Sequence, residues 1–223
     1  MKSTILYTVL LLALPFSLHA QQAVKKDFKR WDSDMKRFAE ADAKQAPPKN
    51  HVLFIGSSSI RMWKLDQTFP GKAYINRGFG GSEIVDSTHF AEQIMFPYTP
   101  RKIFLYAGDN DVSKGRSAEG VLEDYQVFVK KVHSKLPETQ IIYLPIKPSL
   151  ARWNLWPEMK QANQLIATFA AENDRLAYAD TVTPMLGDDG KPKSEYFLKD
   201  GLHMNDAGYA AWVKVVKPFL DRD

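Results

Sequence analysis

The chain has 223 residues, of which 44% are hydrophobic, and it contains no cysteine. This length is enough for one substantial core but short for two independent domains. The lack of cysteine excludes disulfides, thiolate metal ligands and cysteine catalysis. The formal net charge of +4 comes without a block of consecutive basic residues, so a nucleic-acid partner is not predicted.

Residues 1–20 have the pattern of a secretory signal peptide. Lys2 precedes an apolar run from Ile5 to Leu14, and a small residue, Ala20, ends the segment. The run is shorter than the ~20 residues that span a bilayer, so a retained membrane anchor is the weaker alternative. We therefore expect export to the periplasm or the cell exterior. After the leader is removed, we expect no stable membrane insertion and a net charge of +3, from 29 basic and 26 acidic residues.

An amphipathic helix is predicted from Val24 to Ala43. Its apolar residues recur at intervals of three and four between charged ones, as Phe28, Trp31, Met35 and Phe38. We expect this stripe to pack on the rest of the protein, with a partner-binding or membrane-surface helix as the alternative. Two prolines then end the helix. Residues 21–48 thus form an N-terminal helix and proline linker, and residues 49–223 form one domain.

Within residues 49–223, short apolar runs alternate with helical patterns, which predicts a parallel sheet covered by helices on both faces. The five predicted strands are His51–Ile55, Ala73–Ile75, Lys102–Tyr106, Gln140–Leu144 and Leu176–Ala179. The predicted helices are Ser58–Leu65, Glu83–Ile94, Ala118–Leu136, Glu158–Glu172 and Asn205–Leu220, the last with Asn205 as its N-cap. The fold class is therefore α/β, a three-layer α/β/α sandwich.

In such a sheet the ligand crevice lies beyond the carboxyl ends of the strands. Glycine and small polar residues follow the first three predicted strands, in the segments Gly56 to Ser59, Asn76 to Gly81 and Gly108 to Asp111. Loops of this composition let backbone N–H groups approach a substrate closely. Taken alone, the three consecutive serines of the first loop are equally consistent with a polar turn that caps a helix.

Near the C-terminus, Asp200 and His203 lie three residues apart, so a single turn can point both side chains the same way. A carboxylate placed in this manner can orient an imidazole that takes a proton from a serine hydroxyl. The other histidines lack this arrangement, and we expect them to be structural or exposed: His19, His51, His89 and His133.

These four segments resemble, in order, the four sequence blocks of the SGNH or GDSL hydrolases, from Val52 to Trp212. The resemblance implies a flavodoxin-like SGNH hydrolase domain over residues 49–223. It also implies two-step acyl transfer to and from serine, without a metal or an organic cofactor. Ser58 would be the nucleophile, with His203 and Asp200 as its partners. The oxyanion hole would consist of the N–H groups of Ser58 and Gly81 and the side-chain amide of Asn110.

One position departs from the family pattern, because Ser57 occurs where the family usually has an acidic residue. That residue is outside the family's triad, so the departure concerns loop support and rate more than reaction type. The nucleophile elbow of α/β-hydrolases is a poorer match, since Gly-x-Ser-x-Gly would need glycine at Ile60.

Three further residues are candidate substrate contacts. Trp153 and Trp156 follow the fourth predicted strand and could stack on a sugar or an acyl group, or could anchor a loop by burying aromatic area. Arg77, on the glycine-rich loop, could meet an anionic substrate or form a structural ion pair.

The substrate implied is a small-molecule or glycan ester, and we favour short acyl groups such as acetyl on carbohydrate. Lysophospholipase and thioesterase activities are the alternatives within the family. A metal-dependent phosphoesterase would use hard ligands from Asp109, Asp111, Asp200 and His203. A non-catalytic glycan-binding protein would keep the tryptophans but gain nothing from the Asp200 and His203 pair.

Overall fold

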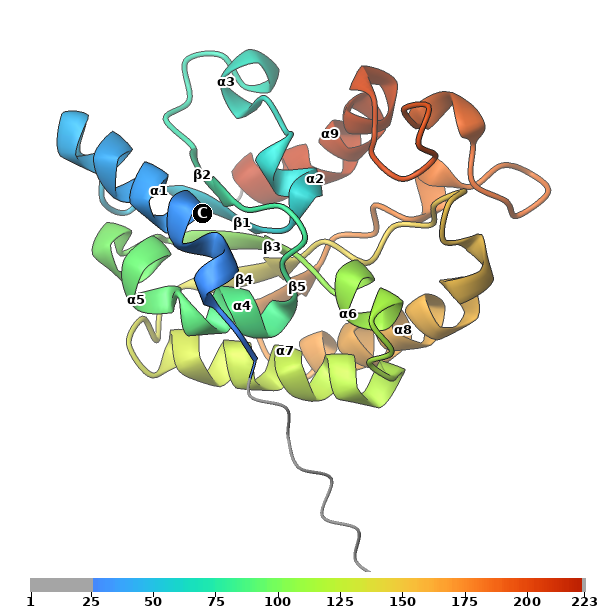
Figure 1. The fold of residues 1–223 in the computed structure, drawn as a ribbon, viewed down its shortest axis with the longest axis horizontal. Coiled ribbons are helices and arrows are strands. Elements are labelled where there is room, and N and C mark those ends of the chain that lie inside the picture. Colours follow the sequence, from blue (N-terminus) through green and yellow to red (C-terminus); the bar gives the residue numbers. More distant parts are fainter. Residues whose placement is uncertain (1–25, 222–223) are drawn as a thin grey trace, which may run out of the picture.

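The computed structural model describes residues 26–221, which form a five-stranded parallel sheet between two layers of helices (Figure 1). The strands are β1 (Val52–Gly56), β2 (Ile75–Gly78), β3 (Lys102–Tyr106), β4 (Gln140–Tyr143) and β5 (Leu176–Tyr178). Their order is β2-β1-β3-β4-β5, and every neighbouring pair is parallel. The predicted fold class, with its flavodoxin-like sheet, is confirmed. The predicted signal peptide at residues 1–20 lies outside the described residues. The predicted start of the N-terminal helix at Val24 was wrong for the part that is described, because residues 26–28 are not helical and the α-helix begins at Asp32.

The strands are mainly apolar because both of their faces are covered, although β2 carries Asn76 and Arg77. In β1, Leu53 and Ile55 face one core, whereas Val52 and Phe54 face the other. All five residues of β1 and of β3 are buried, as expected for a parallel sheet between helical layers.

Helices cover each face of the sheet (Figure 1). The face with Leu53 and Ile55 packs against α1 (Asp32–Lys44), α4 (Ile84–His89), α5 (Ala91–Ile94), α7 (Ala118–His133) and α8 (Trp156–Ala171). The opposite face packs against α2 (Ser58–Arg61), α3 (Leu65–Thr68) and α9 (Asp206–Asp221), while α6 (Asp109–Ser113) follows β3 directly. Short 3-10 helices lie at Lys29–Trp31, Phe96–Tyr98, Trp153–Leu155, Thr183–Met185 and Ser194–Tyr196. Within residues 26–221 no helix has both the length and the apolar character needed to cross a bilayer.

Several predicted boundaries were wrong. The predicted helix Ser58–Leu65 is two short helices, because the Asn76 side-chain amide donates to the carbonyls of Ile60 (2.7 Å) and Trp63 (3.1 Å) and ends α2 there. The second strand continues through Asn76 to Gly78 instead of ending at Ile75.

Two further differences concern helices. The predicted helix Glu83–Ile94 breaks at Phe90, whose buried ring packs edge-on against Phe79. Helix α6 lies in a segment predicted as loop. The predicted cap of the last helix is confirmed, since the N–H of Gly208 donates to Asn205 Oδ1 (3.1 Å).

The N-terminal helix packs on the domain with its apolar stripe, as predicted. Trp31, Met35 and Phe38 are buried in the core beneath it. The indole N–H of Trp31 donates to the carbonyl of Gly80 (3.1 Å), which ties this segment to the loop after β2. The stripe is therefore buried within this chain rather than exposed for a partner or a membrane surface.

The sheet order reverses direction between β1 and β3, because β2 lies on one side of β1 and β4 lies on the far side of β3. Loops that leave the carboxyl ends of two such strands diverge to opposite faces and leave a crevice between them. The segments that follow β1 and β3 begin α2 and α6, so Ser58 and Asn110 border this crevice.

Candidate active site

Ser58 is the first residue of α2, directly beyond the carboxyl end of β1. Gly56 makes the sharp exit from the strand with φ of +129°, and a Cβ at this position would lie 1.9 Å from the carbonyl oxygen of Tyr106. The N–H of Ser57 donates to that same oxygen (3.0 Å). The turn therefore requires glycine and leaves Ser58 with its hydroxyl at the crevice.

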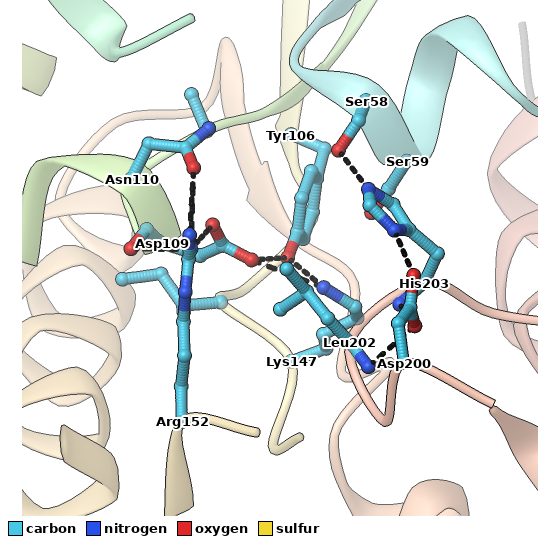
Figure 2. A network of polar contacts seen from close by, with 12 residues as sticks. Ser58, Ser59, Tyr106, Asp109, Asn110, Lys147, Arg152, Asp200, Leu202 and His203 are labelled. Carbon is cyan, nitrogen blue, oxygen red and sulfur yellow. Dashed lines mark hydrogen bonds and ion pairs between the residues drawn. The ribbon is translucent and has the colours of Figure 1, made fainter. Parts of the chain in front are cut away.

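Ser58, His203 and Asp200 form a continuous hydrogen-bonded chain (Figure 2). The Ser58 Oγ lies 3.1 Å from His203 Nε2, and His203 Nδ1 lies 2.6 Å from Asp200 Oδ2. The other oxygen of Asp200 accepts from the N–H groups of Leu202 and His203, both at 2.9 Å. The structure thus brings together the three residues that the resemblance implies as a triad.

The electrostatics favour an ionised Asp200. Its hydrogen bond with His203 and the N–H of Leu202 lower its pKa to about 2. An ionised carboxylate accepts from a protonated Nδ1, so His203 keeps its Nε2 lone pair for the Ser58 hydroxyl. This arrangement can remove a proton from Ser58 without displacing either partner.

The three implied oxyanion donors line one pocket of about 440 Å³ together with His203. The N–H groups of Ser58 and Gly81 have no acceptor among the described residues. The Asn110 amide donates one N–H to the carbonyl of Ser82 (2.9 Å), which leaves its second N–H free. Gly81 has φ of +76°, a conformation that glycine adopts without strain.

An ionic network centred on Asp109 lies at the wall of the pocket (Figure 2). Asp109 accepts from Lys147 Nζ (3.0 Å) and the Tyr106 hydroxyl (3.0 Å), and it also pairs with Arg152. Burial alone would raise the pKa of Asp109, but the charges of Lys147 and Arg152 outweigh it and hold the pKa below its ordinary value. Arg152 also donates to Asn110 Oδ1 (3.2 Å), so this network fixes the orientation of the Asn110 amide.

Sequence reasoning did not assign Lys147 and Arg152 to the site. Lys147 is 1% exposed, which for a lysine requires a partner such as Asp109. The available signal was their position: both follow β4, at the same edge of the sheet as the loops of Ser58 and Asn110.

The residues of the metal-dependent alternative do not form a ligand cluster. Asp109 is held by two cations, whereas Asp111 accepts from the N–H of Ile84 (3.0 Å) in a separate buried position. In the part of the chain that the structure describes, no three acidic or histidine side chains are arranged to hold a metal ion.

The three predicted substrate contacts have structural partners instead. Arg77 is buried, pairs with Asp42 and donates to the Tyr98 hydroxyl (2.8 Å), so its structural interpretation replaces the substrate one. Trp153 and Trp156 stack on each other with centroids 5.9 Å apart, and Trp156 packs against the core. None of these three is among the described residues that line the pocket with Ser58.

The other described histidines do not line the pocket and were predicted to be structural or exposed. The ring of His89 stacks on Phe28 with centroids 3.7 Å apart. His133 Nε2 lies 3.0 Å from the carbonyl oxygen of Thr139, and His51 is half-buried. His19 lies outside the described residues.

Comparisons with known proteins agree with this geometry. A model of the GDSL-like lipase/acylhydrolase family matches residues 56–211, which include all four blocks. The match spans more than half of the chain, which therefore belongs to this family of carboxylic ester hydrolases. None of the curated proteins matches the chain.

Solved structures share the fold. A Streptococcus pneumoniae protein described as a candidate platelet activating factor is 24% identical, with a TM-score of 0.77 over 86% of this chain and 93% of its own. A GDSL-like lipase from Bacteroides thetaiotaomicron is 19% identical, with a TM-score of 0.74 and coverage of 87% and 98%. An acetylxylan esterase from Geobacillus stearothermophilus is 14% identical, with a TM-score of 0.63 and coverage of 80% and 97%.

Proposed function

We propose that the protein is a serine esterase that forms an acyl-enzyme on Ser58. The observation that carries this proposal is the chain from Ser58 Oγ through His203 to Asp200, at 3.1 Å and 2.6 Å, beside a pocket lined by three potential oxyanion donors. Distances of this size are those at which a base can take the proton of a nucleophilic hydroxyl.

In the proposed reaction, Ser58 Oγ attacks the ester carbonyl carbon while its proton moves to His203 Nε2. The carbonyl oxygen becomes an oxyanion that accepts from the N–H groups of Ser58 and Gly81 and from Asn110. Collapse of this intermediate breaks the bond to the alcohol, which leaves with the proton from His203. Water then attacks the acyl-enzyme, again with His203 as the base, and releases the carboxylic acid and free Ser58.

We further propose short acyl groups, such as acetyl on a carbohydrate, as the preferred substrates. The pocket of about 440 Å³ is lined mainly by polar and charged residues, which suits a small acyl group on a polar alcohol better than a long acyl chain. The acetylxylan esterase fold is consistent with this preference. Export by the leader at residues 1–20, and a hydrolase domain at residues 49–223, belong to the same proposal.

The test is hydrolysis of p-nitrophenyl esters from acetate to palmitate by the leaderless protein, with and without EDTA. We expect chelator-resistant activity that is highest on acetate and is lost in Ser58→Ala. Ser59→Ala is the matched control, since Ser59 is buried in the same helix and has no role in the proposed reaction. EDTA-sensitive activity that survives Ser58→Ala would overturn the mechanism.

The chain-length profile separates the alternatives within the family. A maximum at long acyl chains, or on thioesters or lysophospholipids, would replace the short-acyl preference with a lysophospholipase or thioesterase activity. Ligand binding without turnover, unchanged in Ser58→Ala, would instead support a non-catalytic glycan-binding protein.

A further inference from the structure

Three arginines and two aspartates line the pocket that contains Ser58: Arg30, Arg61, Arg152, Asp34 and Asp109. Both aspartates have cationic partners already. Asp109 pairs with both Lys147 and Arg152, a group whose net charge is +1, and Asp34 pairs with Arg37 (2.8 Å). The guanidinium of Arg152 is used by Asp109 and Asn110. Among the arginines that line this pocket, Arg30 and Arg61 are therefore the two without an anionic partner in the described residues.

Arg30 and Arg61 have no ion pair and no side-chain hydrogen bond within residues 26–221. Packing holds them in place instead. The Arg30 guanidinium lies over the ring of Trp31, 4.3 Å from its centroid. Both side chains are exposed, so each can exchange water for a ligand at low cost.

The two guanidinium groups lie against Gly80 and Gly81 in the loop after β2, called the oxyanion loop below because it carries the Gly81 N–H. A Cβ on Gly81 would meet Arg30 at 3.0 Å, and a Cβ on Gly80 would meet Arg61 at 3.2 Å. Because these glycines have no side chains, Arg30 from the N-terminal segment and Arg61 from α2 can both approach the Gly81 N–H. An anionic group of a ligand at this point would reach both arginines while an ester carbonyl faces Ser58.

We propose that Arg30 and Arg61 form an anion-binding site for the substrate, and that the substrate is an ester with a carboxylate close to the scissile bond. This inference rests on the proposed esterase function. A guanidinium presents paired N–H donors that match a carboxylate, and hydrogen bonds between charged groups are stronger than neutral ones. The carboxylate belongs either to the alcohol, as in an acetylated uronic acid, or to the acyl group, as in a dicarboxylic hemiester.

The test compares matched acidic and neutral esters. For the alcohol side, the pair is 4-acetoxybenzoate and its methyl ester; for the acyl side, it is p-nitrophenyl hemisuccinate and p-nitrophenyl butyrate. The ratio of kcat/KM values, acidic over neutral, is measured for the leaderless protein and for the Arg30→Gln, Arg61→Gln and double variants. The pair with the larger change identifies which part of the substrate carries the charge.

We expect this ratio to be roughly 10- to 100-fold lower in the double variant, because KM for the acidic ester rises. In the unchanged protein, added salt should also lower the ratio. Arg175→Gln is the matched control, because Arg175 pairs with Glu138 at the opposite edge of the sheet. A ratio that stays constant in the double variant for both ester pairs would overturn the proposal.

Binding separates this proposal from the esterase proposal. The Ser58→Ala variant is titrated calorimetrically with an acetylated uronic acid and with p-nitrophenyl hemisuccinate. The same titrations are made with Ser58→Ala that also carries Arg30→Gln and Arg61→Gln. Binding that requires Arg30 and Arg61 supports the anion site even where no turnover is found. Binding of neither ligand, or equal binding without the arginines, contradicts the site whatever the esterase assay gives.

Discussion

At the scale of single residues, Asp200 combines two structural tasks in one turn. Its Oδ1 accepts from two backbone N–H groups, and its Oδ2 is bonded to His203 Nδ1. The first set of bonds holds the carboxylate still, although its side chain is 47% exposed. The second bond selects the imidazole tautomer that can accept the Ser58 proton. A mutation can therefore remove the bond that selects the His203 tautomer and keep the bonds that hold the side chain of residue 200 in position.

Asp200→Asn tests the tautomer. An asparagine can keep the two backbone bonds through its oxygen, but its amide N–H then faces Nδ1 and moves the imidazole proton to Nε2. We expect kcat for ester hydrolysis to fall about 10³- to 10⁴-fold, while the melting temperature changes little. Activity within 10-fold of the unchanged protein would mean that Asp200 does not orient His203 during catalysis.

Asn110→Ala tests the side-chain oxyanion donor. A donor that bonds the oxyanion only in the transition state affects kcat and not substrate binding, so kcat should fall roughly 10²- to 10³-fold at nearly constant KM. The assay uses p-nitrophenyl acetate. A rise in KM with unchanged kcat would contradict the role, and circular dichroism melting checks that the variant remains folded.

The sequence predicted those site residues that belong to motifs with fixed spacing. Asp200 and His203 lie three residues apart, and Asn110 lies within an intact family block. Arg30 and Arg61 belong to no such spacing, because packing on Trp31 and on the glycines of the oxyanion loop places them at the pocket. Arg77 was a candidate ligand contact because it lies in the glycine-rich segment near the second strand. Its partner Asp42 is distant in the sequence and could not be recognised there.

At the scale of secondary-structure elements, the active-site loops are held by elements that bring no catalytic group. The short helix at Lys29–Trp31 and α1 reach the loop after β2 through the bond from Trp31 to the Gly80 carbonyl. Trp31 is 2% exposed and packs edge-on against Phe79. The N-terminal helix therefore both covers the core and positions the Gly81 N–H.

Trp31→Ala is expected to lower the free energy of unfolding by about 3–5 kcal/mol, because it leaves a large cavity in the core. Trp31→Phe retains most of the apolar contact and removes the indole donor, and the lost hydrogen bond costs about 1 kcal/mol. Urea unfolding of both variants measures these differences. A loss of less than 1 kcal/mol in Trp31→Ala would show that the helix contributes little to the core.

Element types were predictable because their apolar periodicity is local. Some of their ends were not predictable, since the groups that end those helices come from distant residues. Helix α2 ends where Asn76, 16 residues from Ile60, takes the free carbonyls of its last turn. The periodic apolar residues from Ser58 to Leu65 could not predict that interaction.

At the scale of the whole molecule, the parallel sheet creates two cores and buries ionisable groups at the edge of one of them. Asp111 is 1% exposed, and its Oδ2 has no hydrogen-bond partner among the described residues. Burial, with a smaller effect of the Glu83 charge, raises its pKa to about 7. The pKa of the same group is near 3.8 in the absence of this environment.

This difference predicts a pH dependence of stability. Below about pH 4 Asp111 is protonated in both the folded and the unfolded chain. Between that pH and pH 7 the unfolded chain binds fewer protons than the folded one, so stability falls as pH rises, by about 4 kcal/mol in total. Asp111→Asn removes this titration but can still accept from the N–H of Ile84.

Urea unfolding of the unchanged protein and Asp111→Asn at pH 4, 6 and 8 measures the effect. The variant should gain stability relative to the unchanged protein with each step upward in pH. A constant difference between the two proteins would mean that Asp111 has the same pKa in the folded and unfolded chains.

Labelling with a fluorophosphonate tests the central claim most directly. An activated Ser58 Oγ attacks phosphorus, fluoride leaves, and one stable adduct forms that intact mass and peptide mapping can locate. We predict a single adduct on Ser58, full labelling of Ser59→Ala, and none of Ser58→Ala. An active protein that is labelled at Ser57 or Ser59, or that keeps both labelling and activity in Ser58→Ala, would contradict the assignment of the nucleophile.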